Sequence, residues 1–233
     1  MKSDAKSTIE TGKAILGIEL GSTRIKAVLI DQENKPIAQG NHTWENQLVD
    51  GLWTYSIEAI WSGLQDCYAD LRSNVKNLYG IEIENLAAIG VSAMMHGYMP
   101  FNAKEEILVP FRTWRNTNTG RAAAALSDLF VYNIPLRWSI SHLYQAILDN
   151  EAHVKDIDFL TTLAGYVHWQ LTGEKVLGIG DASGMLPIDP PTHNYSAEMV
   201  AKFDKLIAPN QYNWTLQDIL PKVLSARESA GVL

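Results

Sequence analysis

The stretch Ala14 to Asp31, AILGIELGSTRIKAVLID, decides the fold of the first part of the chain. Two short apolar runs, residues 15–18 and 27–30, flank a small polar turn, and each has the length of a strand. This pattern predicts an antiparallel β-hairpin whose bend carries chemically useful groups. The bend and its flanks contain a carboxylate, a glycine, two hydroxyls and an ammonium: Glu19, Gly21, Ser22, Thr23 and Lys26.

Such a bend suits two different roles. Successive backbone N–H groups form a concavity that attracts anions, and a glycine lets a ligand approach the backbone closely. A carboxylate beside the bend can hold Mg²⁺ through water, because this ion keeps several of its own waters. The same residue types also make an ordinary turn with no ligand. From the residues alone, both interpretations of the bend stay open.

The composition is that of an ordinary globular protein. The 233 residues, 46% hydrophobic and 19% charged, suffice for one large domain or two small ones with real cores. The net charge of -7 disfavours a nucleic-acid-binding surface. A single cysteine, Cys67, excludes an internal disulfide framework and a cysteine-rich zinc site. A reducing, cytoplasmic setting follows as the default expectation.

The N-terminal segment is polar. Residues 1–13 lack the apolar core of a signal peptide, and no apolar run in the chain approaches the roughly 20 residues needed to span a bilayer. We therefore expect a flexible leader over residues 1–13 and no membrane partner.

The order of the expected elements excludes a dinucleotide-binding fold. Residues 35–43 predict a third antiparallel strand, and residues 52–79 predict a long amphipathic helix that Gly80 ends. Residues 86–91 then predict a buried strand parallel to the first. This βββαβ order differs from alternating strands and helices, and no GxGxxG occurs. A second hairpin is expected around residues 102–106. Further helices are expected at residues 119–131, 139–150, 158–171 and 196–207.

Polar and aromatic groups follow the strand at residues 86–91. His96 can exchange hydrogen bonds with sugar hydroxyls, but a histidine satisfied within a loop is an equally good interpretation. Trp114 can cover the apolar face of a sugar ring while Arg115 and Asn116 bond its hydroxyls. Trp114 could as easily be a core anchor, so a sugar site is one of two interpretations here.

Five ordered segments resemble landmarks of the N-terminal half of FGGY carbohydrate kinases, most of all those of xylulokinases. They are residues 18–23 (IELGST), 94–97 (MMHG), 113–116 (TWRN), 171–174 (LTGE) and 181–185 (DASGM). The resemblance covers residues 14–233 and implies an α/β, actin-like (ribonuclease-H-like) domain with a mixed five-stranded sheet flanked by helices. It also implies a kinase that moves the γ-phosphoryl of ATP to a hydroxyl of a ketopentose or related sugar.

The resemblance implies a role for each matching residue. The phosphates of ATP would contact Gly21, Ser22, Thr23 and Lys26. Mg²⁺ would be held through water by Glu19, where the family has Asp. The sugar would contact Met95, His96, Trp114, Arg115 and Asn116.

The chain also departs from the family pattern. Residues 115–118, RNTN, replace the usual Asn-Asp-x-Arg, which changes the hydroxyl pattern that the pocket recognises. Residues 141–145, SHLYQ, lack the usual Lys and Trp. The family's general base, an Asp in a Gly-Gly-x-Asp segment, is expected beyond Leu233, so no catalytic residue is expected in this chain. Because phosphoryl transfer needs both substrates positioned together, we expect the chain alone to be inactive.

The expected partners are a sugar, ATP, the missing C-terminal domain of the same enzyme and a second copy in a homodimer. Two alternatives stay open. A non-catalytic sugar-binding or regulatory module would explain the departures as lost chemistry. An actin-like ATPase would keep the phosphate turn but lose the sugar landmarks, and His96 and Trp114 argue against it.

Overall fold

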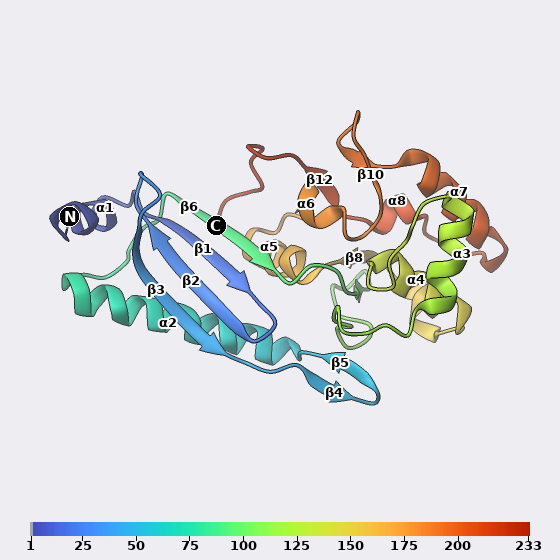
Figure 1. Ribbon diagram of the computed structural model, residues 1–233, viewed down its shortest axis with the longest axis horizontal. Helices are drawn as coiled ribbons and strands as arrows, with labels where there is room; N and C mark the ends of the chain where they lie inside the picture. Colours follow the sequence, from blue (N-terminus) through green and yellow to red (C-terminus); the bar gives the residue numbers. More distant parts are fainter. Residues whose placement is uncertain (1) are drawn as a thin grey trace. The chain divides into compact units, whose positions relative to one another are not determined.

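The structure is a computed structural model that describes residues 2–233, with side chains from Asp4 onward. The residues form two compact units. The sheet unit comprises residues 1–47 and 55–94, and the helical unit comprises residues 48–54 and 95–233. Figure 1 colours the chain from blue at the N-terminus to red at the C-terminus.

The sheet unit is built on a mixed sheet with the strand order β3-β2-β1-β6 (Figure 1). Its strands are β1 (Ile15–Leu20), β2 (Arg24–Ile30), β3 (Pro36–Thr43) and β6 (Ala88–Ala93). β1, β2 and β3 pair antiparallel in sequence order, and β6 pairs with β1 in parallel. The α/β class, the three-strand meander and the parallel fourth strand are thus confirmed.

The expected fifth strand of this sheet is not found. Within residues 2–233, β6 has a neighbour on one side only, because the remaining strands pair with one another. These pairs are β4 (Gln47–Val49) with β5 (Leu52–Thr54), β7 (Met99–Phe101) with β8 (Phe159–Thr161), β9 (Val176–Gly178) with β12 (Lys222–Leu224), and β10 (Ile188–Asp189) with β11 (Asn194–Tyr195). The sheet therefore has four strands rather than five.

Helix α2 (Ile57–Tyr79) covers one face of the sheet, mainly over β3 and β2 (Figure 1). It begins where the Ser56 hydroxyl accepts the Ala59 N–H at 3.1 Å and ends at Gly80, whose φ of 70° suits glycine. Its expected start at residue 52 was too early, because β5 occupies residues 52–54. The helix packs closely: a Cβ added at Gly40 would lie 2.3 Å from the Cys67 carbonyl oxygen.

The two faces of the sheet differ in burial, as the alternation of the strands predicts. One face of β1 and β2 is apolar, and its side chains are buried: Leu16, Ile18, Leu20, Ile25, Ala27 and Leu29. Gly17, Glu19 and Lys26 alternate with them and are exposed, and Val28 is half-buried. The β1–β2 turn and its charged neighbours are therefore carried on a rigid, well-packed pair of strands.

The other helices are α1 (Lys2–Glu10), α3 (Gly120–Phe130), α4 (Ser139–Leu148), α5 (Leu163–Thr172), α6 (Ile179–Ala182), α7 (Ala197–Ile207) and α8 (Leu216–Ile219), with 3-10 turns at Ala152–Asp156 and Ala208–Asn210. The predictions for α3, α4 and α7 are confirmed. The prediction of a helix from residue 158 was too long, because β8 takes residues 159–161 and Thr162 caps α5.

The N-terminal segment differs from expectation. Residues 1–13 were expected to be a flexible leader, yet Lys2–Glu10 is helical and its Ala5 and Ile9 are buried, with exposed fractions of 7% and 2%. The segment is polar overall, but Ala5 and Ile9 are four positions apart and so lie on one face of the helix, where they are buried.

Candidate functional site

The carbonyl oxygens of the turn between β1 and β2 accept hydrogen bonds from two aromatic residues. Trp44 donates its indole N–H to the Gly21 oxygen at 2.7 Å, and Tyr55 donates its hydroxyl to the Ser22 oxygen at 2.6 Å. The Trp44 backbone N–H donates to the Thr23 oxygen at 3.3 Å. The two aromatic rings stack with centroids 4.1 Å apart. Three successive carbonyls are thus fixed by one aromatic pair.

The other side of this turn offers hydrogen-bond donors. Gly21 donates its N–H to the Arg24 oxygen at 2.9 Å, but the N–H groups of Ser22 and Thr23 find no acceptor among residues 2–233. Both residues are exposed. Successive free N–H groups in a turn with fixed carbonyls form a binding concavity for an anion, and phosphate oxygens are suitable acceptors. Such a turn is compatible with the phosphate contact predicted for residues 21–23, which stays a prediction.

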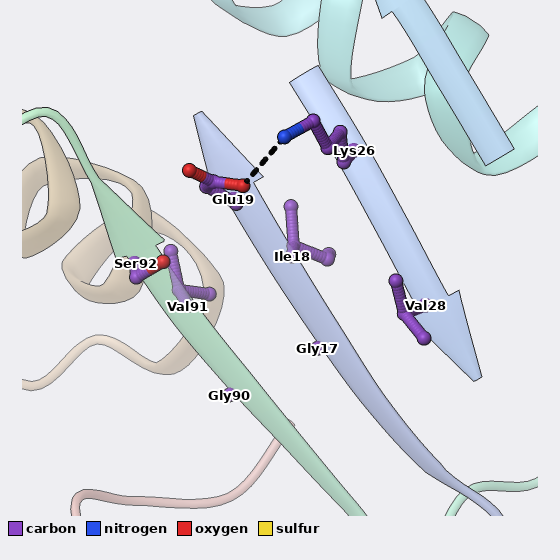
Figure 2. A pocket seen from close by; sticks show the side chains of 8 residues that line it. All are labelled: Gly17, Ile18, Glu19, Lys26, Val28, Gly90, Val91 and Ser92. Atoms are coloured by element: carbon purple, nitrogen blue, oxygen red, sulfur yellow. Dashed lines mark hydrogen bonds and ion pairs between the residues drawn. The ribbon is translucent and has the colours of Figure 1, made fainter. Parts of the chain in front are cut away.

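Glu19 and Lys26 face each other across the β1–β2 pair, where they are directly opposed in register (Figure 2). The Lys26 ammonium lies 3.3 Å from Glu19 Oε2, and the side chains are 48% and 53% exposed, respectively. Both flank an open depression of about 440 Å³ on the uncovered face of the sheet. Its lining residues are Gly17, Ile18, Glu19, Lys26, Val28, Gly90, Val91 and Ser92.

The donor set around Glu19 limits how a metal ion could bind. Among the described residues, no cluster of three His, Cys, Asp or Glu side chains could enclose a metal. Glu19 Oε2 is engaged by Lys26, whereas Oε1 lies 3.7 Å from where a Cβ on Gly21 would stand, on the side of the turn. One carboxylate oxygen beside a turn with unpaired backbone N–H groups is compatible with the predicted Mg²⁺ held through water.

His96 lies in the helical unit, three residues after the end of β6. Its Nδ1 is 3.4 Å from the Gly184 carbonyl oxygen, which can only accept, so Nδ1 is the protonated nitrogen in this contact. Nε2 is then free to accept a hydrogen bond from a ligand hydroxyl. Burial lowers the pKa of His96, the Gly184 carbonyl raises it, and the Arg137 guanidinium lowers it further. The imidazole is therefore neutral at pH 7.

The position of the His96 ring depends on Gly184. A Cβ added at Gly184 would lie 2.6 Å from His96 Nδ1 and 3.1 Å from Met95 Cε. Ser139 fixes the adjacent backbone by donating its hydroxyl to the Gly97 oxygen at 2.6 Å. Met95 itself is 40% exposed, which leaves it accessible to a ligand. The structure thus brings Met95 and His96 together against residue 184.

Trp114 is linked to the segment that carries His96 through Arg137. Tyr98 and Arg112 exchange backbone hydrogen bonds of 2.9 and 3.2 Å in an isolated antiparallel bridge, and the Gly97 N–H donates to the Arg137 carbonyl oxygen at 3.4 Å. The Arg137 guanidinium lies over the Trp114 ring, 5.2 Å from its centroid. Arg137 was missed from the sequence, since nothing in its neighbourhood along the chain indicates contact with Trp114.

Arg115 and Asn116 are engaged elsewhere. The Arg115 guanidinium lies 3.5 Å from the ring centroid of Trp53. Asn116 is buried; its side-chain oxygen accepts the Trp53 N–H at 2.9 Å, and its amide donates to the oxygens of Trp53 at 2.8 Å and Thr113 at 3.1 Å. Both side chains hold β5 in place, so the geometry favours a structural role for them rather than the predicted contact with a sugar.

A buried polar network supports the loops that carry His96 and Trp114. Arg112 pairs with Glu151 through two contacts, one of them 3.0 Å between Nη1 and Oε1. Tyr98 and His153 share a hydrogen bond of 2.8 Å. His142, on α4, is fully buried, and neither of its ring nitrogens has a hydrogen-bond partner among the described residues. Burial, with the charge of Arg112 and the proximity of His96, lowers the pKa of His142 to about 3.

Comparison with known proteins identifies the family of the domain that carries the β1–β2 turn and the residues around His96. The profile of the FGGY family of carbohydrate kinases, N-terminal domain, matches residues 14–233. The chain belongs to the FGGY family of carbohydrate kinases. Its resemblance to this family in five sequence segments is therefore confirmed.

Several FGGY kinases are similar to this chain. The xylulose kinase of Escherichia coli (strain K12) is 19% identical over 225 residues, which cover 94% of this chain and 43% of that protein. A xylulose kinase from Rhodospirillum rubrum superposes with a TM-score of 0.77 at 16% identity, covering 95% and 45% of the two chains. A gluconate kinase from Lactobacillus acidophilus gives 0.77 at 18% identity, covering 94% and 43%.

These similarities establish the fold of an FGGY N-terminal domain. The chain spans less than half the length of these relatives. Within residues 2–233, no helix combines the length and apolar character that crossing a membrane requires.

Proposed function

We propose that this chain is the sugar-binding and phosphate-facing half of an ATP-dependent kinase that phosphorylates a hydroxyl of a ketopentose or related sugar. The observation that carries the proposal is the turn at residues 21–23. Its carbonyls are tied to Trp44 and Tyr55, and the N–H groups of Ser22 and Thr23 are free. The family membership and the names of the similar xylulose and gluconate kinases support a sugar as the acceptor.

The residues divide into two roles under this proposal. The turn at residues 21–23 and Lys26 bind phosphate oxygens of ATP, and Glu19 holds Mg²⁺ through water. When bound, Mg²⁺ neutralises charge on the phosphates. The sugar is bound by Met95, His96 and Trp114. Nε2 of the neutral His96 ring accepts a hydrogen bond from a sugar hydroxyl, and Trp114 covers an apolar face of the sugar ring. The general base for the sugar hydroxyl comes from a second domain.

One observation favours a second candidate, a sugar-binding module without catalysis. Lys26 already neutralises Glu19 at 3.3 Å, so a metal ion must compete with an ammonium for this carboxylate. Under that candidate, sugar binds and MgATP does not.

Binding measurements on the 233-residue chain separate the two candidates. For the kinase half, we expect calorimetry to detect MgATP binding that Lys26→Met weakens about threefold to tenfold, because one phosphate contact is lost. Lys35→Met, in the β2–β3 connection at the opposite end of β2, is the matched control and should bind like the wild type. Absence of MgATP binding, with sugar binding intact, would favour the module without catalysis.

Kinetics test the role of Glu19 once the second domain is supplied, in cis or in trans. The chain alone should show no turnover. In the complete enzyme, Glu19→Gln should preserve sugar affinity and lower kcat by about one decade or more, each decade being about 1.4 kcal/mol of transition-state stabilisation. Glu19→Asp should keep much of the activity. A metal role also requires a changed Mg²⁺ dependence in the Gln variant, and an unchanged one contradicts it.

A further inference from the structure

Arg137 has a different environment from two other arginines of the helical unit. Arg112 pairs with Glu151, and Arg121 pairs with Asp149 at 3.0 Å. The exposed guanidinium of Arg137 forms no ion pair and no hydrogen bond with any residue of the described chain; its contact is with the Trp114 ring at 5.2 Å. A guanidinium of this kind keeps its hydrogen-bond donors available for a ligand.

The backbone places Arg137 beside the sugar-binding residues. The Gly97 N–H donates to the Arg137 carbonyl oxygen at 3.4 Å, so Arg137 is adjacent to the residue that follows His96. Its charge also lowers the pKa of the His96 ring. Arg137 immediately precedes Trp138 and α4, whose first residue, Ser139, bonds the Gly97 oxygen. These two hydrogen bonds, from Gly97 to Arg137 and from Ser139 to Gly97, hold the main chain of this arginine against residues 94–97, the His96 loop.

The segment that carries Trp114 offers Arg137 no carboxylate. Residues 114–118, WRNTN, contribute an arginine and no carboxylate. The chain as a whole carries a net charge of -7, so carboxylates that could pair with Arg137 are abundant elsewhere on its surface. A neutral sugar gains only ordinary hydrogen bonds from a guanidinium, whereas a carboxylate gains a charge-assisted, bidentate pair.

We propose that Arg137 is a specificity-determining residue that pairs with a carboxylate on the substrate, so that this site selects a sugar acid, a polyhydroxy carboxylate, over the neutral sugar of the same carbon skeleton. The inference rests on the proposed sugar-binding site and, among the ketopentoses and related sugars of the proposed function, assigns the acceptor to the sugar acids. Trp114 then contacts the carbon skeleton, His96 Nε2 accepts from a hydroxyl, and Arg137 binds the carboxylate.

Matched ligands test this assignment on the 233-residue chain. Calorimetry with D-gluconate against D-glucitol, and with D-xylonate against xylitol, compares the acid with its neutral counterpart. We expect each acid to bind at least about tenfold more tightly than its counterpart, with the preference reduced by salt. Arg137→Gln should abolish the preference while leaving affinity for the neutral ligand unchanged. Arg137→Lys should keep part of it, because it keeps the charge but not the planar fork.

The control variant is Arg121→Gln, which removes an exposed arginine of α3 in the same unit and should leave the preference intact. Equal affinity for acid and neutral ligand, or a preference that survives Arg137→Gln, would overturn the assignment and leave the sugar site standing. An equal loss for both ligands in Arg137→Gln would also overturn it, since Arg137 would then act through Trp114 packing. Absence of binding by the acids and the polyols would overturn the assignment, and if the ketopentose D-xylulose also failed to bind, the proposed sugar site would be overturned with it.

Discussion

The turn at residues 21–23, which we propose binds phosphate and call the phosphate turn, and the His96 loop at residues 94–97 are built in opposite ways. The turn at residues 21–23 is a tight β-hairpin bend, and its partners Trp44 and Tyr55 follow within the next 33 residues. The His96 loop depends on Gly184, 88 residues away along the chain, and on Arg137 and Ser139 from the start of α4. The first site presents backbone donors, whereas the second presents side chains.

This difference explains what each site tolerates. A site made of backbone N–H groups survives side-chain replacement provided that its scaffold stays intact. A site made of side chains from distant segments fails when one neighbour changes shape. The following variants test that contrast, beginning with the largest expected effect.

Gly40→Ala should damage the scaffold of the phosphate turn most. The new Cβ would lie 2.3 Å from the Cys67 oxygen and 2.5 Å from the Leu71 nitrogen, both backbone atoms of α2 that cannot move alone. We expect the free energy of unfolding of the sheet unit to fall by about 3 kcal/mol. Hydrogen exchange resolved by peptide should show faster exchange in β1–β3 and little change around His96. Gly90→Ala, where a Cβ meets nothing within 4 Å, is the control. Uniform destabilisation of both units would contradict the separation.

Acid should destabilise the helical unit through His142. Its native pKa of about 3 lies below the unfolded value of about 6.5, so the unfolded state binds more protons between these pH values and stability falls as pH decreases. This residue alone should remove about 2 kcal/mol between pH 6.5 and 5, at most. His142→Leu should flatten the pH dependence in urea unfolding.

The matched control for that experiment is His193→Asn, at an exposed position with a φ of 54° that Asn accepts. It should retain the wild-type pH dependence. A His142→Leu variant that remains as acid-sensitive as the wild type would show that other groups control acid unfolding.

Gly184→Ala should impair the His96 loop without unfolding it. The added methyl would stand 2.6 Å from His96 Nδ1, so the ring must rotate away from its sugar-binding position. Affinity for the preferred sugar or sugar acid should fall about tenfold, or about 1.4 kcal/mol, while MgATP binding stays unchanged. Gly180→Ala, with no atom within 4 Å of the new Cβ, serves as control. If sugar affinity were the same in both variants, the position of His96 would not matter for binding.

Tyr55→Phe should have the smallest effect. It removes the 2.6 Å hydrogen bond to the Ser22 oxygen and should cost about 1 kcal/mol of stability. MgATP affinity should fall with it, because the turn loses one of its fixed carbonyls. Tyr79→Phe removes the same kind of bond, from α2 to the Ile37 oxygen at 2.8 Å, away from the turn. Equal MgATP affinity in the two variants would mean that the carbonyl bond does not shape the turn.

The sequence predicted local features of the fold well. Alternating apolar residues in 15–20 and 24–30 fix which face of the sheet is buried, and Gly80 ends α2 through its positive φ. The five-strand count came from the family resemblance, and no periodicity indicates which strand neighbours β6. Residues 159–161 were assigned to a helix because their pairing with residues 99–101 is remote along the chain.

The candidate site was predictable to the same extent. The turn at residues 21–23 was predictable, since glycine and short polar residues define its backbone, and its contact with phosphate stays a prediction. Arg115 and Asn116 have suitable chemistry for a sugar, but their direction is set by Trp53, more than 60 residues earlier. Arg137 carries no local signal, because its importance comes only from contact with Trp114 and the His96 loop.

The aromatic pair behind the phosphate turn changes how mutational data on this domain should be interpreted. Because Trp44 and Tyr55 hold the turn by its carbonyl oxygens, the side chains of Ser22 and Thr23 are exposed and free to vary. If this turn binds phosphate as proposed, a deep mutational scan should assign high tolerance to Ser22 and Thr23 and low tolerance to Trp44 and Tyr55, which hold the turn by its carbonyl oxygens. At this turn, tolerance to substitution should therefore depend on whether a side chain supports the backbone of the turn, rather than on how near it lies to the ligand.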